Sequence, residues 1–221
     1  FVYRMYDEAN ETDFQEIITN LANLGIGDEA AIDYCYENPE IDADDEDDGL
    51  TIKNALDYTT EITSNEASAV VGLKGAMLNS LKKNDTEYLW QGDEEHWSGQ
   101  APVCFPIVGV LRDSKGTAFG KPCEMKRHGI ARISPFELFE KHKNSVTFIQ
   151  KSSDETKKQY PFDYELKIKY TINGSTVTNE YIITNTGSLP MPFVIGGHPA
   201  FNCPLCDGEV FEDYKVVFDR A

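Results

Sequence analysis

The sequence predicts a mainly β protein, an antiparallel β-sandwich with a short acidic α-helical extension at its N-terminus. Three observations lead to this prediction: one long stretch alternates between apolar and polar residues, turn signals recur at short intervals, and acidic residues crowd the beginning of the chain. Many short strands without alternating helices are typical of antiparallel sandwiches and barrels. With 221 residues, the chain is long enough for one large domain or for a medium domain with an extension.

Charge is distributed unevenly along the chain. Residues 1–50 hold sixteen of the 38 acidic residues and a single basic one, whereas the remainder has 22 acidic and 19 basic residues. We therefore expect an acidic helical extension over residues 1–49 and the sandwich over residues 50–221. Nucleic-acid binding is not expected, because phosphate recognition needs a basic surface and the net charge is −18. No membrane span is expected either, because no stretch approaches about 18 apolar residues.

Two helices are expected in the acidic extension. Thr12 and Gln15 have the spacing of a capping box, and apolar residues at helical spacing follow them. Residues 28–36 form the second expected helix, which Pro39 cannot continue. Helices flanking acidic loops also resemble a degenerate EF-hand calcium-binding pair, although the twelfth position of one loop is Ala55 instead of a bidentate glutamate. The simpler interpretation of the acidic run is a solvated linker.

The most regular strand signal covers residues 162–172, where apolar or aromatic residues alternate with polar ones, so that one face is buried and the other is wet. Asn173-Gly174 follows, a pair preferred in two-residue type I′ turns because both central positions need positive φ. The chain then returns in a strand at residues 175–184 and completes a hairpin. Turn signals recur at residues 84–85, 114–116, 152–154 and 185–188. Further strands are expected at residues 51–62, 69–73, 146–150 and 214–218.

Two of the four histidines lie in segments that favour a functional site. Residues 128–132 place the imidazole of His128 and the guanidinium of Arg132 around a glycine; in an extended segment both side chains point to one face and into one cleft. His198 lies between two glycines and a proline, which hold a side chain at a strand end. Histidine is a natural general acid or base near neutral pH. We predict that His128, Arg132 and His198 share one site; the alternative is two unrelated surface histidines.

The five cysteines form no regular framework, and their number is odd. No basic-then-apolar secretion signal follows Phe1, so reduced thiols in a cytoplasmic protein are expected. Cys203 and Cys206 have the C-x-x-C spacing of redox and zinc sites, but no second cysteine pair accompanies them. We interpret them as ordinary loop and core thiols, and no metal or cofactor is expected.

Six short motifs follow one another along the chain, each weak alone and fairly specific as an ordered set. They occupy residues 75–81, 87–91, 101–109, 128–132, 160–162 and 197–204. Together they are similar to the galactose-mutarotase-like (aldose 1-epimerase) family, in particular its bacterial LacX-type branch. The resemblance covers roughly residues 75–204.

The resemblance implies a large β-sandwich, the family's supersandwich, that binds a monosaccharide in an open cleft and interconverts the α and β anomers of a free hexose. In the family a histidine protonates the ring oxygen and a glutamate takes the proton from the C1 hydroxyl. By motif position His198 is that acid, while His128 and Arg132 hold sugar hydroxyls. The expected protein is a cytoplasmic, aldose 1-epimerase-like isomerase of carbohydrate metabolism. The alternative is a non-catalytic carbohydrate-binding domain of the same fold.

Three departures from the family pattern bear on these expectations. The family's glutamate motif has no counterpart after His198, so we expect a sandwich incomplete at its C-terminus, completed by a second chain or a missing segment. Met77 stands where an acidic residue is usual. Gln100 stands where sugar-phosphate-specific relatives carry arginine, which disfavours a phosphorylated sugar. The acidic residues 1–49 have no counterpart in the family.

Overall fold

The computed structural model describes residues 59–206 and 208–217. The expected N-terminal helices, the EF-hand-like loops and the boundary at residue 49 all lie outside these residues. The described part is built mainly from strands, with one short α-helix, α5 (Asp154–Gln159), and three 3₁₀ turns, η1 (Arg112–Ser114), η2 (Ala131–Ile133) and η3 (Phe211–Asp213). The strands are β1 (Thr59–Thr63), β2 (Ala67–Gly72), β3 (Met77–Lys83), β4 (Thr86–Glu87), β5 (Val103–Cys104), β6 (Lys115–Ala118), β7 (Lys121–Glu124), β8 (Glu137–His142), β9 (Ser145–Lys151), β10 (Tyr164–Asn173), β11 (Thr176–Asn185) and β12 (Gly196–Gly197).

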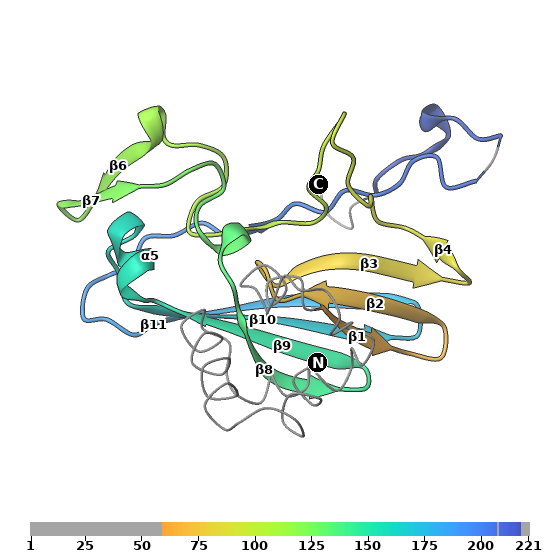
Figure 1. Ribbon diagram of the computed structural model, residues 1–221, viewed down its shortest axis with the longest axis horizontal. Coiled ribbons are helices and arrows are strands. Elements are labelled where there is room, and N and C mark those ends of the chain that lie inside the picture. The colour runs from red at the N-terminus through yellow and green to blue at the C-terminus, as the bar shows by residue number, and fades with distance from the viewer. Residues whose placement is uncertain (1–58, 207, 218–221) are drawn as a thin grey trace, which may run out of the picture.

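Two four-stranded sheets dominate the fold, with strand orders β1-β2-β3-β4 and β11-β10-β9-β8 (Figure 1). Every paired strand in both sheets is antiparallel. Apolar side chains from β1, β2, β9 and β10 meet in one buried cluster between the sheets. The predicted mainly β, antiparallel sandwich is therefore confirmed for the described residues.

Strand β10 shows why the alternating pattern predicts a sandwich. Its five apolar and aromatic residues are buried, while the polar residues between them are partly exposed. Tyr170, the largest buried group near its end, donates a hydrogen bond from its hydroxyl to the carbonyl oxygen of Ala76 at 2.9 Å. Because this bond satisfies a buried hydroxyl, an aromatic residue with a polar end fits in the apolar core.

The hairpin of β10 and β11 is confirmed, but its turn lies one residue later than predicted. Asn173 pairs with Thr176, so Gly174 and Ser175 form the loop. Only Gly174 has positive φ, at 56°, which is the pattern of a glycine-first turn instead of the predicted type I′ turn. The hydroxyl of Ser64 donates to the carbonyl oxygen of Gly174 at 2.6 Å. This long-range contact helps to fix the loop and is absent from the local pattern.

Two other strand predictions have different outcomes. The strand expected at residues 51–62 is confirmed for its described part, residues 59–62, which lie in β1. The strand expected at residues 214–218 is wrong for its described part, residues 214–217, which has no regular secondary structure. Val216 and Val217 are 78% and 75% exposed. Apolar residues form a strand only where a neighbouring strand pairs with their backbone, and the described residues place none there.

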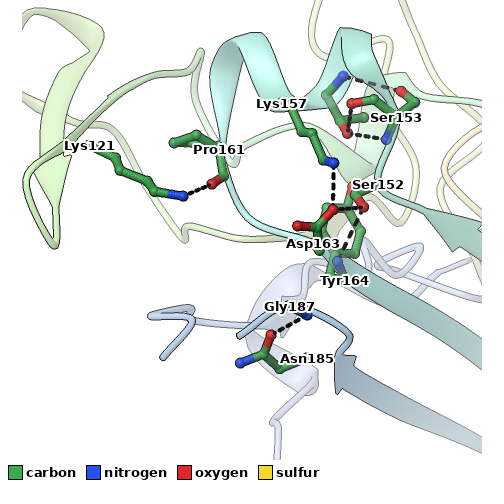
Figure 2. A network of polar contacts seen from close by, with 10 residues as sticks. Lys121, Ser152, Ser153, Lys157, Pro161, Asp163, Tyr164, Asn185 and Gly187 are labelled. Carbon is green, nitrogen blue, oxygen red and sulfur yellow. Dashed lines mark hydrogen bonds and ion pairs between the residues drawn. The ribbon is translucent and has the colours of Figure 1, made fainter. Parts of the chain in front are cut away.

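Helix α5 begins where the sequence predicted only a turn. The Ser153 hydroxyl accepts a hydrogen bond from the Thr156 amide, and the Thr156 hydroxyl accepts one from the Ser153 amide, which together form a capping box (Figure 2). Lys157 then pairs with Asp163 at 2.5 Å, across the link from α5 to β10 (Figure 2). The ammonium of Lys121 on β7 donates to the carbonyl oxygen of Pro161 at 3.0 Å. These contacts fasten the helix and the β6–β7 hairpin to the end of the sheet.

Candidate functional site

The structure brings two of the four histidines together. The ring centroids of His128 and His198 are 5.4 Å apart, with the rings tilted by 57°. The other two lie beside carboxylates near the surface, His96 3.3 Å from Asp93 and His142 2.9 Å from Glu140. The candidate site is therefore the place where the His128 and His198 loops meet.

One extended segment, residues 102–105, carries both loops on its two edges. On one edge β5 pairs with β12, and the amide of His198 donates to the carbonyl oxygen of Pro102 at 3.1 Å. On the other edge the amide of Phe105 donates to the carbonyl oxygen of His128 at 3.2 Å, and the amide of Ile130 donates to the carbonyl oxygen of Phe105 at 2.9 Å. Backbone pairing to a shared strand thus brings two sequence-distant imidazoles within contact distance.

The core anchors this segment through Phe105. The Phe105 side chain is fully buried, and its ring lies 5.1 Å from that of Tyr164 and 6.1 Å from that of Tyr160, both in edge-on arrangements. The ring of Phe193, just before the His198 loop, lies 5.8 Å away. Such aromatic contacts hold the segment rigidly, so the two loops have a fixed support.

The His128 loop is left-handed, not extended as predicted from the sequence. His128 has φ of 65° and Gly129 has φ of 75°, and the chain then enters η2, which contains Arg132. A Cβ atom on Gly129 would lie 2.3 Å from the carbonyl oxygen of Phe105, so only glycine fits this close approach. The premise that His128 and Arg132 share a face of a strand is therefore wrong. A tight turn supported by Phe105 sets their directions.

Arg132 is held within its own loop. Its Nε donates to the carbonyl oxygen of Arg127 at 2.9 Å, and the side chain is half-buried. Its positive charge contributes to lowering the pKa of His128, so the guanidinium lies close enough to the imidazole to affect its charge. The two residues therefore interact electrostatically, whereas the sequence predicted that they share one face of an extended segment.

His128 is held in one tautomer. The amide of Gly109 donates to His128 Nδ1 at 3.0 Å, so Nδ1 must carry a lone pair, and the proton of the neutral ring lies on Nε2. Burial, followed by the charges of His198, Arg132 and Arg127, lowers the pKa of His128 below its usual value. The ring is consequently neutral at pH 7 and offers an N–H donor on its other nitrogen.

His198 is exposed, and an indole lies against it. The centroids of Trp97 and His198 are 5.3 Å apart, with the rings tilted by 55°. Trp97 was not among the predicted site residues, because its neighbours in the sequence are charged and give no sign of a contact with His198. The signal it missed was a large aromatic residue following a run of charged residues.

A cavity of about 280 Å³ opens beside His198, between β3, β10 and β11. Its lining is mostly apolar, with a few polar groups from Asn179, Tyr181 and His198. The residues that line it include Leu78, Leu81, Tyr170, Val177, Tyr181 and Phe201.

Within residues 59–206 and 208–217, no carboxylate forms a hydrogen bond or ion pair with either site imidazole. The same residues contain no group of three or more histidine, cysteine or acidic side chains that could hold a metal ion. Cys203 and Cys206 are free thiols. None of the helices in the described part of the chain has the length and apolar character needed to cross a bilayer.

Comparison with known proteins adds a family match. The family model described as aldose 1-epimerase matches residues 58–216. Two forms of protein LacX from Lactococcus lactis subsp. lactis, plasmid and chromosomal, are 44% and 43% identical to this chain over 156 residues. Each alignment covers 66% of this chain and 52% of the relative. The chain therefore spans about half the length of the curated relatives that it matches.

Two solved structures of galactose mutarotase-related proteins are also similar to this chain. The galactose mutarotase related enzyme from Lactobacillus acidophilus is 37% identical, with a TM-score of 0.68, over 71% of this chain and 53% of that one. A galactose mutarotase-like protein from Lactobacillus casei is 35% identical, with a TM-score of 0.64, over 66% of this chain and 50% of that one. Both similarities extend over most of the described residues.

Proposed function

Because this chain belongs to the aldose 1-epimerase family and to its LacX-type branch, we propose that it provides part of an isomerase that interconverts the anomers of a free hexose. The observation that carries the proposal is the meeting of His128 and His198 at 5.4 Å on one rigid support. Mutarotation needs an acid, a base and hydrogen-bond donors for the hydroxyls within reach of one sugar ring. We place the sugar where the two imidazoles meet, not in the apolar cavity.

His198 is the acid in this proposal. Its exposed ring is accessible to solvent and to a sugar, and as an imidazolium it gives its proton to the ring oxygen while a base removes the proton of the C1 hydroxyl. The bond between C1 and the ring oxygen breaks, and an open-chain aldehyde forms. Rotation about the C1–C2 bond and closure with both proton transfers reversed give the other anomer. Atoms and charges balance, and no cofactor takes part.

His128 and Arg132 bind hydroxyls in this proposal. Because the amide of Gly109 occupies Nδ1, the Nε2–H of neutral His128 is the donor available to a sugar oxygen. The lowered pKa of His128 supports this assignment, since a donor that stays neutral does not compete with His198 for the acid role. Arg132 adds a cationic donor near the same imidazole.

We propose that the general base is a carboxylate outside the described residues. Neither imidazole has a carboxylate partner among residues 59–206 and 208–217, and the chain spans about half of its LacX relatives. A second chain or a further segment with the fold of the remaining half would supply it. The apolar cavity beside His198 supports this proposal, because a covering β layer would bury its lining.

A neutral sugar fits the site better than a sugar phosphate. The amide of Gln100, at the position where phosphate-specific relatives carry arginine, accepts from Asn79 Nδ2 at 2.6 Å and donates to the Asn79 carbonyl oxygen at 3.0 Å. This side chain has no charge and is already paired within the fold. A phosphate group would need cationic donors in its place.

Polarimetry of freshly dissolved α-galactose tests the function. The full chain is assayed alone and together with the separately produced C-terminal half of a LacX relative, and we expect mutarotation above the buffer rate when both are present. His198→Gln should abolish this gain, whereas His142→Gln, at a surface ion pair, should leave it unchanged. If the complemented protein binds galactose by calorimetry without any gain in rate, the non-catalytic carbohydrate-binding alternative replaces the isomerase.

A further inference from the structure

We propose that Trp97 is a positioning residue for His198: its indole, fixed against the backbone at Gly99, holds the exposed imidazole in the orientation that faces His128. The physical contact does not depend on any activity. Its catalytic consequence rests on the function proposed above, in which His198 is the acid.

The side chain of His198 needs an external support. Its backbone is fixed through the amide bond to Pro102, but no hydrogen bond holds its imidazole within the part of the chain that the structure describes. The ring contacts with Trp97 at 5.3 Å and with His128 at 5.4 Å remain to orient it. Both distances lie in the range of favourable tilted aromatic pairs, about 4.5–7 Å. Because His128 is held by its own hydrogen bond, Trp97 is the second fixed neighbour.

The indole is itself held in place. A Cβ atom on Gly99 would lie 2.5 Å from Trp97 Cζ2 and 2.6 Å from Cε2, so the indole occupies the space that a side chain at residue 99 would fill. The carbonyl oxygen of Trp97 accepts from the Asp93 amide at 3.0 Å and from the Trp90 indole at 2.7 Å. Backbone and side chain are thus both fixed, and the indole forms a rigid surface against which His198 packs.

A structural role alone would not require this geometry. An indole placed only to cover the core would be buried, yet Trp97 is 36% exposed and its neighbour His198 is exposed as well. Gly99 is the residue that makes room for the indole. The arrangement therefore predicts that a single added methyl group at Gly99 releases His198 without changing any ring.

The contact can be measured without sugar. The chain has two tryptophans, so Trp90→Phe leaves Trp97 as the single indole. This change removes the Trp90 donor to the Trp97 carbonyl oxygen, and the Asp93 amide continues to hold that oxygen. An imidazolium in contact with an indole quenches its fluorescence, so the emission of this variant should fall in one step as the pH is lowered from roughly 8 to 5, where imidazoles gain charge. The other ionisable groups nearby are His96 with its partner Asp93, His128, and the two arginines that act on His128.

Three further changes, each made in the Trp90→Phe background, assign the step. His198→Gln should abolish it and His96→Gln should leave it, whereas Gly99→Ala should abolish it while the far-ultraviolet circular dichroism stays native. A step that survives both His198→Gln and Gly99→Ala overturns the proposal, and so does a Trp90→Phe protein without any step.

Kinetics of the complemented protein then test the consequence. Trp97→Ala should lower kcat by on the order of tenfold or more with little change in KM, because a displaced acid slows the proton transfer more than it weakens binding. Trp97→Phe should recover most of the rate, since a flat ring is retained. A rise in KM with an unchanged kcat in Trp97→Ala would overturn the positioning role. An intact fluorescence step in a protein without mutarotation would overturn the proposed function and leave the contact established.

Discussion

Replacing Gly129 by alanine tests whether the close approach of the His128 loop to Phe105 holds the site together. Alanine at a φ of 75° costs about 1–2 kcal/mol, because its Cβ crowds the following carbonyl group. The added Cβ would also lie 2.3 Å from the carbonyl oxygen of Phe105, so one of the two groups must move. That carbonyl accepts from the amides of Ile130 and Ala131, and weakening each bond costs about 1 kcal/mol. We expect a total loss of about 3–4 kcal/mol.

Gly120 provides a matched control. It has the same φ of 75°, but a Cβ on it would meet nothing within 4 Å. Gly120→Ala should therefore lose only the conformational cost, about 1–2 kcal/mol. Urea unfolding at pH 7, followed by circular dichroism, measures both free energies. Equal losses for the two variants would refute the argument that the contact with Phe105, and not the backbone conformation, decides the cost at Gly129.

Three more variants test other parts of the structure. His128→Gln should flatten the pH dependence of urea unfolding below pH 6.5. Burial keeps the folded-state pKa of His128 below its ordinary value of 6.5, so its contribution to stability is complete above pH 6.5 and is lost as the pH falls through the folded-state pKa. A pH dependence identical to that of the wild type would contradict this. Tyr170→Phe should lower the free energy of unfolding by about 1–3 kcal/mol, because the buried carbonyl oxygen of Ala76 loses its donor. An unchanged midpoint in thermal or urea unfolding would show that this hydrogen bond makes no net contribution to stability. Ser153→Ala should cost about 1 kcal/mol by loss of the cap of α5, with Ser153→Thr close to wild type, and equal losses for both would argue against capping.

The extent to which the sequence predicted the fold follows from the range of the interactions. The alternation in β10 is a local property, and it predicts a half-buried strand because side chains of a strand point to opposite faces. Strand β3 lacks such a pattern in its residues Met77–Lys83, so its place in the first sheet could not be read in advance. The strand expected at residues 214–218 has the apolar residues of a strand, but no strand in the described part of the chain pairs with residues 214–217, and they remain exposed.

The residues of the candidate site also fall into those that the sequence identified and those that only the structure revealed. The glycine and proline residues around His128 and His198 identified both imidazoles from the sequence, although their chemical roles remain proposals. Arg132 was selected on the assumption of an extended segment, which the left-handed turn at His128 and Gly129 replaces. Trp97 was not selected at all, because its importance lies in a contact with a residue far along the chain.

By itself the sequence determined which segments alternate, where glycine permits sharp turns, and which histidines lie in such turns. Only the tertiary structure decided that residues 102–105 carry one histidine loop on each edge, that Gly109 fixes the tautomer of His128, and that Gly99 makes room for an indole beside His198. The physical reason is that side-chain periodicity is set by the local backbone, whereas strand pairing and ring contacts depend on backbone groups that meet only after the chain has folded.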